Sequence, residues 1–341
     1  MQVNELFRQS NTILLDGGMG TMLQAAGLKL GARPEELNIT DPALIEGIHG
    51  QYAAAGSRIV NANTFGASAH KLAGSAYTLE QVITAGIENC KRACAPYGAL
   101  TALDVGPLGE LLEPSGTLAF EDAVAEYARI VKAGEAAGAD LIFFETYTDL
   151  YELKAALLAA KENTHLPILA SMSFEAGGRT FTGCTVESFA ATARGLGADA
   201  VGINCSLGPK EIFPMAKRLA EAVPGNFPVF VKPNAGLPRA DGSGYDITPQ
   251  LFALQMKPYR ELHLFAAGGC CGTTPEFIKL LNGTFAGCTP GRPAHRMPSV
   301  LCTPVDTVTV DGITVVGERI TPAGKKRFQQ ALREEDMNYV L

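Results

Sequence analysis

Eight short apolar segments recur along the chain, and each one ends in small or polar residues. They are rich in Val, Ile, Leu and Phe and lack strict alternation, which is typical of strands that are buried on both faces. The segments are TILLDGG (12–18), SRIVNANTFG (57–66), ALTALDVG (99–106), ADLIFFETY (139–147), PILASMSF (167–174), ADAVGINCS (199–206), PVFVKPNAG (228–236) and LHLFAAGGCCG (262–272). Such strands belong to a parallel sheet whose faces are covered by helices.

Helical patterns separate these segments. The stretch 41–56 begins with Asp41 as a candidate N-cap and Pro42 in its first turn, and the stretch 120–138 ends at Gly138, a candidate C-cap. Further helical patterns occupy residues 149–162, 186–197, 210–223 and 274–281. Eight strand–helix units in about 290 residues predict a closed TIM (β/α)₈ barrel. The alternative is a doubly wound open sheet, but no GxGxxG motif follows the first strand.

The composition excludes several classes of partner. Apolar residues make up 47% and charged residues 18% of the chain, as in a globular protein. The formal charge is −7 and no Lys/Arg-rich run occurs, so we expect no nucleic-acid partner. No apolar run approaches the roughly 20 residues that span a bilayer, and the start MQVNELFRQSN has no apolar signal core. We therefore expect a cytoplasmic protein without a membrane partner, whose cysteines stay reduced.

The tail of the chain follows a different pattern. Two alternating runs in TVTVDGITVV (307–316) flank Asp311 and Gly312, which predicts a hairpin turning at this pair. An amphipathic segment, 325–341, follows. About 40 residues are too few for a core of their own. We therefore predict a barrel domain of residues 1–303 with a short C-terminal hairpin and helix extension.

The predicted strand ends carry many polar residues. In barrel enzymes the active site lies at the carboxyl ends of the strands, so these residues are the candidates for chemistry. They are Asp16, Gly17, Gly18, Asn61, Asn63, Thr64, Asp104, Glu145, Ser171, Ser173, Asn204, Cys205, Asn234, Cys270 and Cys271.

Three of the eight cysteines lie at these ends. Cys205 ends the sixth strand, and Cys270 and Cys271 end the eighth, with only one strand between them. Three neighbouring thiolates repel one another unless a cation holds them. Zn²⁺ suits them because it binds thiolates tetrahedrally, and three protein ligands leave its fourth position open. The alternative is that these thiols are small buried apolar groups, which is how we interpret Cys90, Cys94, Cys184, Cys288 and Cys302.

Six motifs occur together in a fixed order. They are LLDGGMGT (14–21), ANTFGAS (62–68), FFET (143–146), GINCS (202–206), KPNAG (232–236) and GGCCGTTP (268–275). Over roughly residues 5–300 the chain thus resembles the homocysteine S-methyltransferase family. The resemblance implies that Cys205, Cys270 and Cys271 bind Zn²⁺ and that homocysteine is methylated to methionine.

Within that family the likeness is greatest to the amino-terminal homocysteine-binding module of cobalamin-dependent methionine synthases. The motif VVGERITPAG (315–324) resembles the start of the pterin-binding domain that follows this module, although Thr321 stands where Asn is usual. The resemblance implies that residues 304–341 are a linker and the truncated start of a pterin-binding-like domain. It also implies methylcobalamin, on a corrinoid-binding protein or domain, as the methyl donor.

Two alternatives to this donor remain open. The chain is either a stand-alone methyltransferase that uses a small donor such as betaine or S-methylmethionine, or a homocysteine-capture module that is inactive without partner domains. In the main interpretation, a zinc-bound homocysteine thiolate attacks the methyl group of the corrinoid. Zinc favours this because binding deprotonates a thiol that is otherwise mostly protonated at neutral pH. The three cysteines are then catalytic through the zinc ion.

The amino-acid end of the substrate needs its own partners. The family assigns the substrate ammonium to the position of Glu145. Asp16, with the backbone of Gly17 and Gly18, either receives the substrate carboxylate or ties the loop together. The side-chain oxygen of Asn234 is a candidate fourth zinc ligand, with a loop-stabilising role as the alternative. We expect Asn63 and Asn204 to be further substrate contacts.

Overall fold

Eight parallel strands form one sheet in the order β1-β8-β7-β6-β5-β4-β3-β2. The computed structural model describes residues 3–29, 31–239, 244–293, 297–313, 315 and 321–340. The strands are β1 (Ile13–Leu14), β2 (Ile59–Asn61), β3 (Leu100–Val105), β4 (Leu141–Tyr147), β5 (Ile168–Met172), β6 (Ala200–Asn204), β7 (Val229–Lys232) and β8 (Ala266–Ala267). A parallel bridge between Leu14 and Ser57 joins the two ends of the sheet, which confirms the predicted TIM barrel.

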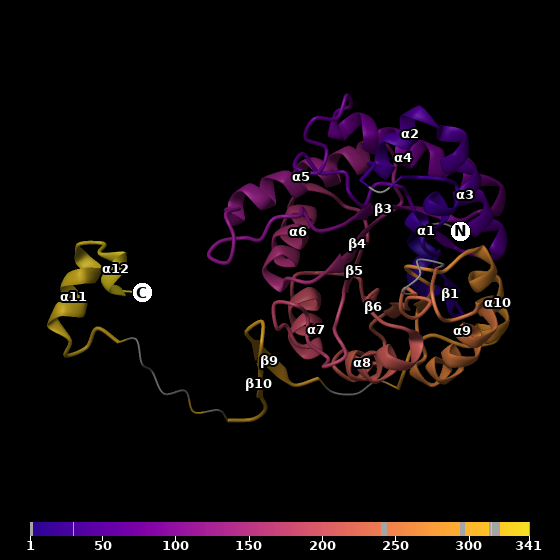
Figure 1. Ribbon diagram of the computed structural model, residues 1–341. Coiled ribbons are helices and arrows are strands. Elements are labelled where there is room, and N and C mark those ends of the chain that lie inside the picture. The colour runs from indigo at the N-terminus through magenta and orange to yellow at the C-terminus, as the bar shows by residue number, and fades with distance from the viewer. Residues whose placement is uncertain are drawn as a thin grey trace.

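Helices surround the sheet on its outer side (Figure 1). They are α1 (Met19–Ala25), α2 (Leu37–Thr40), α3 (Pro42–Ala55), α4 (Leu79–Cys94), α5 (Phe120–Ala136), α6 (Leu150–Asn163), α7 (Val186–Gly195), α8 (Pro209–Glu221), α9 (Pro249–Met256) and α10 (Pro275–Phe285). Asp41 caps α3 as predicted, since its side chain accepts from the Leu44 N–H at 3.2 Å. No helix in the described ranges is both long enough and apolar enough to cross a membrane.

The apolar core has two layers. The larger layer lies between the sheet and the helices, and a smaller cluster fills the inside of the barrel. Because side chains alternate along a strand, Leu141 and Phe143 of β4 belong to this inner cluster and Glu145 follows on the same face. Phe143 meets Phe230 of β7 edge-on, with ring centroids 5.0 Å apart. These two rings form an apolar floor beneath the polar strand ends.

A neutral histidine is buried in the outer layer. His49 of α3 is fully buried, and neither ring nitrogen has a hydrogen-bond partner among the described residues. Burial lowers the pKa of His49 to about 3. The unfolded chain titrates this group near ~6.5, so its contribution to stability is complete above that pH and is lost as the pH falls toward 3.

We expect this histidine to make the protein acid-sensitive. Between about pH 7 and pH 5 it should lower the free energy of unfolding by about 2 kcal/mol. Urea unfolding at the two pH values should show this loss in the wild type and its absence in His49→Leu. Replacing the exposed His165 by Leu is the control and should leave the pH dependence unchanged. Equal pH dependence in His49→Leu and wild type would contradict the assignment.

The structure describes a C-terminal hairpin in which β9 (Ser299–Cys302) pairs antiparallel with β10 (Thr307–Val310). Its turn spans residues 303–306, where the Thr303 N–H donates to the Asp306 carbonyl at 2.9 Å. The hairpin predicted to turn at Asp311 and Gly312 needs residues 313–316, of which 314 and 316 lie outside the described residues. The Thr185 N–H, at the start of α7, donates to the Pro304 carbonyl at 3.1 Å and holds this turn on the barrel.

The last part of the chain is described only in pieces. Residues 314 and 316–320, which include the whole GERI sequence (317–320), lie outside the described residues. Helices α11 (Lys326–Arg333) and α12 (Met337–Val340) follow, as the amphipathic segment predicted. The hairpin spans the predicted boundary at residue 303. A separate domain beginning at residue 304 stays a prediction.

Candidate active site

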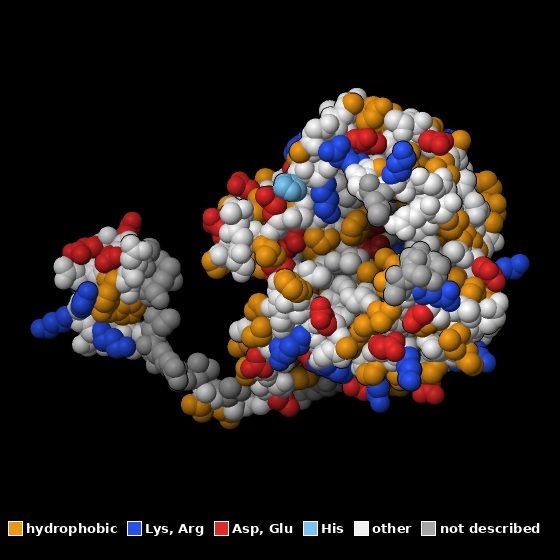
Figure 2. All heavy atoms as spheres, viewed as in Figure 1, with side chains coloured by type: hydrophobic (Ala, Val, Ile, Leu, Met, Phe, Trp, Pro, Cys, Tyr) orange, Lys and Arg blue, Asp and Glu red, His pale blue; other side chains and the backbone are white. Residues whose placement is uncertain are grey.

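A cavity of about 420 Å³ opens at the carboxyl ends of the barrel strands. Figure 2 shows the hollow near the centre of this face. Its lining includes predicted residues and others that the sequence did not single out. The predicted ones are Asp16, Gly17, Gly18, Asn61, Asn63, Asp104, Glu145, Cys205, Cys270 and Cys271, and the additional ones include Glu35, Lys232 and Tyr245.

The three predicted cysteines come together in this cavity. Their sulfur atoms all lie within 4.8 Å of one another, and those of Cys205 and Cys271 are 3.9 Å apart. Among the described residues this is the only group of three or more His, Cys, Asp or Glu side chains that can hold a metal ion. A tetrahedral zinc ion with Zn–S bonds of about 2.3 Å places its sulfur ligands about 3.8 Å apart. The three thiols therefore fit zinc.

The backbone conformation after β6 and β8 determines where these thiols point. Cys205 and Ser206 both have left-handed φ angles, 62° and 60°, which turn the chain sharply after β6. Such conformations are uncommon for residues other than glycine and concentrate at functional sites. The Cys205 N–H donates to the Lys232 carbonyl at 3.1 Å, and the Cys270 N–H donates to the Pro233 carbonyl at 2.9 Å. The loop that carries Cys205 and the loop that carries Cys270 and Cys271 are therefore both hydrogen-bonded to the end of β7. We call these two segments the ligand loops.

The thiols share charge unequally. Hydrogen bonds from Cys270 and Cys271 lower the pKa of Cys205 to about 3. The same bonds raise the pKa of Cys271 to about 11 and that of Cys270 well above its usual range. Two thiols therefore stabilise one thiolate, which is the charge distribution expected of a site that attracts a soft cation.

Tyr245 packs against the ligand loop that carries Cys270 and Cys271. A Cβ atom on Gly272 would lie 2.3 Å from the Tyr245 ring, and Gly272 has a φ of +79°. Burial, and then the neighbouring Cys271, raise the pKa of Tyr245 to about 12. The tyrosine thus forms a wall of the cavity beside Cys271, and only glycine at position 272 leaves room for it.

We expect Gly272→Ala to damage this wall. The clash should lower the free energy of unfolding by about 1–3 kcal/mol and weaken zinc binding about 10- to 100-fold through Cys271. Gly27→Ala is the matched control, because Gly27 also has a left-handed φ (+97°) but no atom of the described residues crowds its Cβ position within 4 Å. Urea unfolding and zinc titration against a chelator measure both effects. Equal losses in the two variants would contradict the role of Tyr245.

A buried cation lies beside the thiols. The Lys232 Nζ is 3.0 Å from Asp16 Oδ1 and 2.8 Å from Glu145 Oε1, and the lysine is 2% exposed. Burial lowers the pKa of Lys232, but the two carboxylates outweigh it and raise the pKa well above its ordinary value. Asn61 ties the pair together: its N–H donates to Asp16 Oδ2 at 2.7 Å and its side chain to Glu145 Oε2 at 3.1 Å.

Two further carboxyl groups of the lining are buried. Asp104 at the end of β3 has one oxygen without a hydrogen-bond partner in the described part of the chain. Burial and the nearby Glu145 raise the pKa of Asp104 well above its usual range. Glu35 accepts from the Gly66 N–H at 2.7 Å, and burial raises its pKa as well. The lining therefore carries four acidic side chains, Asp16, Glu35, Asp104 and Glu145, in addition to the three thiols.

Three more of the predicted asparagines form internal hydrogen bonds. Asn204 is fully buried and donates to Glu145 at 3.3 Å, and its side chain lies 3.8 Å from Cys270 Sγ. The Asn234 side chain accepts from the Cys271 N–H at 3.1 Å, and its backbone N–H donates to the Leu207 carbonyl, two residues after Cys205, at 3.0 Å. Asn63 donates to the Pro34 carbonyl at 2.8 Å. Asn234 thus stabilises both ligand loops, and its role as a zinc ligand stays a prediction.

Glycines 17 and 18 sit where the backbone passes close to its neighbours. A Cβ atom at Gly17 would lie 2.7 Å from Thr273, and one at Gly18 would lie 2.8 Å from the Cys270 carbonyl. The Gly18 N–H donates to the Thr273 carbonyl at 3.1 Å, so this amide is used inside the protein. Asp16 ties the same loop to β2 and β7 through its bonds to Asn61 and Lys232.

The remaining cysteines lie elsewhere. Four are buried as predicted, namely Cys90, Cys94, Cys184 and Cys288. Cys302 is exposed, so its prediction as a buried apolar group is wrong. Its place at the end of β9 leaves the thiol on the outside of the barrel, 3.4 Å from Thr192 Oγ1.

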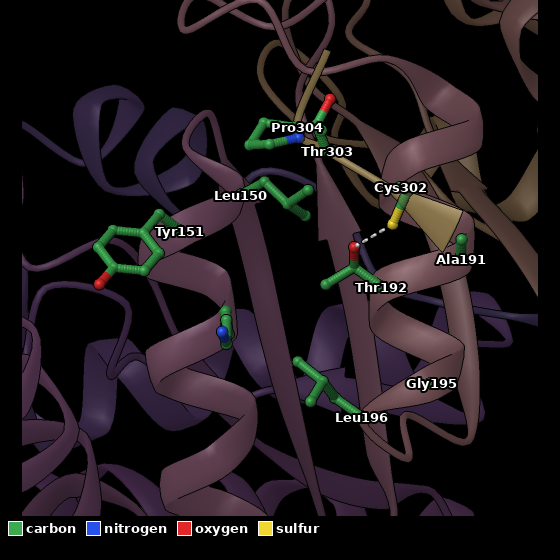
Figure 3. Close-up of a pocket in the computed structure, with 10 residues that line it drawn as sticks. Leu150, Tyr151, Ala191, Thr192, Gly195, Leu196, Cys302, Thr303 and Pro304 are labelled. Atoms are coloured by element: carbon green, nitrogen blue, oxygen red, sulfur yellow. Dashed lines mark hydrogen bonds between the residues drawn. The ribbon is translucent and has the colours of Figure 1, made fainter. Parts of the chain in front are cut away.

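Cys302 borders a second cavity of about 360 Å³, between α6 and α7 (Figure 3). Leu150 and Leu196 contribute apolar lining there, and Pro304 lies near Leu150. Within the described ranges no metal-binding cluster forms at this groove. We therefore assign the chemistry to the first cavity.

Solved structures share this fold. The oxidized form of the homocysteine methyltransferase MmuM from Escherichia coli superposes with a TM-score of 0.71 and 24% identity, over 82% of this chain and 98% of that one. Its metallated form gives a TM-score of 0.71 and 23% identity, over 82% and 99%. At this identity the likeness concerns the fold.

Sequence relatives identify the family. The methionine synthase of Mycobacterium tuberculosis (strain ATCC 25618 / H37Rv) is 32% identical over 347 residues, which cover 94% of this chain and 29% of the relative. That of Mycobacterium leprae (strain TN) is also 32% identical, over 354 residues with the same coverage. The chain thus spans 29% of the length of these relatives. Because the family profile also matches residues 13–285, the chain belongs to the homocysteine S-methyltransferase family.

Proposed function

We propose that this protein is a zinc-dependent homocysteine S-methyltransferase that forms methionine with a methyl group carried by a corrinoid. The observation that carries the proposal is the meeting of three thiols, within 4.8 Å of one another, beside a cavity lined by carboxylates. One end of this cavity suits a thiol-binding metal and the other suits an ammonium group. A small amino acid with a terminal thiol, such as homocysteine, matches both ends.

Cys205, Cys270 and Cys271 would hold the zinc ion. When bound, zinc supplies a Lewis acid with an open position that lowers the pKa of a substrate thiol. The protein's own residues hold the ligands in place: Asn234 joins the two ligand loops, and Asn204 links Cys270 to Glu145. In the reaction, a bond forms between the substrate sulfur and the methyl carbon, the bond to the donor breaks, and the thiol proton is released.

The acidic side of the cavity would hold the amino-acid end. A carboxylate can accept about four hydrogen bonds, and Glu145 accepts three within the described structure, from Lys232, Asn61 and Asn204. One acceptor site therefore remains for the substrate ammonium. We place the substrate carboxylate beside the backbone of Gly17, which lines the cavity and presents no side chain that would block it. The neighbouring Gly18 N–H is already bound to the Thr273 carbonyl.

The relatives favour a corrinoid as the methyl donor. Enzymes named methionine synthase match this chain over 94% of its length. The sequence motifs resemble those of the homocysteine-binding module of the cobalamin-dependent form. A small donor, betaine or S-methylmethionine, is the second candidate, because proteins of the same fold carry the name homocysteine methyltransferase alone.

One experiment separates these donors. The purified protein, loaded with zinc, is incubated with L-homocysteine and, in turn, with methylcobalamin, S-methylmethionine or betaine, and methionine is quantified. The proposal predicts methionine from methylcobalamin, at a rate that rises when a corrinoid-binding protein carries it. If methionine forms only with S-methylmethionine or only with betaine, that compound is the methyl donor and the corrinoid part of the proposal is wrong. No bound zinc and no methionine from any donor would overturn the function.

A further inference from the structure

Lys232 is the one cationic side chain of the candidate site, within the described residues, that contacts two carboxylates from different strands. Its Nζ reaches Asp16, after β1, and Glu145, on β4, at 3.0 and 2.8 Å. Lysine is almost never fully buried without such partners. The lysine head also lies 5.1 Å above the ring of Phe143, on the apolar floor of the barrel. Lys232 is therefore fixed from below and from two sides.

The position of Lys232 also connects the two ends of the site. Its side chain holds the carboxylates, while its backbone carbonyl accepts the N–H of Cys205 at 3.1 Å. Two residues later on the same segment, Asn234 accepts the N–H of Cys271. The end of β7 thus sets the spacing between the thiols and the carboxylates, which must match the length of one substrate.

The charges around Lys232 are unequal. Asp16 and Glu145 supply two carboxylates against one ammonium group, and the cluster sits where water is largely excluded. Two carboxylates that meet at one point share a proton when no cation separates them, and their oxygens then hydrogen-bond each other. With Lys232 between them they can each keep an oxygen directed elsewhere, and one more cation completes the charge balance.

We propose that Lys232 is a positioning residue that holds Asp16 and Glu145 apart and directs them at the ammonium group of the substrate. This inference rests on the proposed function, and it assigns the preference for an α-amino thiol to a residue outside the metal site. A purely electrostatic view makes the opposite prediction, because removing a cation would leave the site more negative and strengthen ammonium binding.

Binding of two thiols to the zinc-loaded protein tests the proposal. L-Homocysteine carries the ammonium group, whereas 4-mercaptobutanoate has the same thiol and carboxylate without it. Calorimetry should show that the wild type prefers homocysteine by at least about 30-fold, as for a buried charge pair. In Lys232→Met this preference should fall at least about tenfold, with about one zinc per chain retained.

A second comparison guards against misfolding. Lys232→Met leaves two buried carboxylates without their cationic partner, which is strongly destabilising. Asp16→Asn removes one of them, so Asp16→Asn/Lys232→Met is compared with Asp16→Asn alone. Positioning by Lys232 predicts a lower preference for homocysteine in the double variant, and net charge alone predicts a higher one.

The outcomes separate the two proposals. A wild type that discriminates, with a preference that is unchanged or stronger in both Lys232→Met variants, overturns the role of Lys232 and leaves the proposed function standing. A wild type that binds neither thiol overturns the proposed function itself. If the variants bind homocysteine and 4-mercaptobutanoate equally more weakly than the wild type, Lys232 has only a structural role. That result also overturns the positioning role.

Discussion

Replacing Cys271 by serine should remove most of the bound zinc and lower methyl transfer to homocysteine at least about 100-fold, because the metal contributes several kcal/mol to catalysis. The three sulfurs lie within 4.8 Å of one another, so losing one leaves two soft ligands where zinc requires at least three protein ligands. Zinc content by atomic absorption and methionine formation measure the two effects.

Cys302→Ser is the matched control. It changes the same single atom on the exposed outside of the barrel, where the thiol contacts only Thr192 among the described residues. We expect full zinc content and full activity in this variant. If Cys271→Ser kept one zinc per chain with wild-type turnover, the three cysteines would not be the metal site.

Replacing Glu145 by glutamine should raise the KM for homocysteine at least about 30-fold, with a smaller effect on kcat, because removal of one partner from a buried charge pair costs about 2–5 kcal/mol. Glu145 faces Lys232 at 2.8 Å and accepts from Asn61 and Asn204, so the glutamine amide also places a donor against existing donors. Initial rates over a range of homocysteine concentrations separate KM from kcat.

Glu152→Gln controls for the general cost of a buried glutamate. Glu152 is buried on α6, where it accepts from the Leu108 N–H at 2.7 Å and the Tyr127 hydroxyl at 2.9 Å, outside the cavity lining. This variant should lose stability with little change in KM. A KM for Glu145→Gln as low as that for Glu152→Gln would remove Glu145 from the substrate site.

The barrel could be predicted from the sequence because its two signals, the apolar strand runs and the helical patterns between them, are local. Fully buried parallel strands require continuous apolar runs, and all eight runs became strands of one sheet. The C-terminal hairpin could not be placed in the same way. Thr307–Val310 alternates equally well with either neighbour, and the choice of β9 depends on the contact between Pro304 and Thr185 at the start of α7. Such a tertiary contact leaves no local pattern.

The cluster of three thiols could also be predicted, since chain order and the strand-end rule together place Cys205 near Cys270 and Cys271. Lys232 was missed because a charged residue after an apolar run looks like the solvent-exposed end of a strand. Its burial depends on Asp16 and Glu145, which come from distant parts of the chain. The lysine within an otherwise apolar run, VFVK, is the signal that points to a buried ion pair.

X-ray absorption at the zinc edge, with and without L-homocysteine, tests the central claim most directly. The account predicts three sulfur ligands at about 2.3 Å in the purified protein and four after homocysteine is added. It also predicts that homoserine, in which a hydroxyl replaces the thiol of homocysteine, leaves the sulfur count at three. A zinc ion with fewer than three sulfur ligands, or a sulfur count that does not rise with homocysteine, would contradict the account.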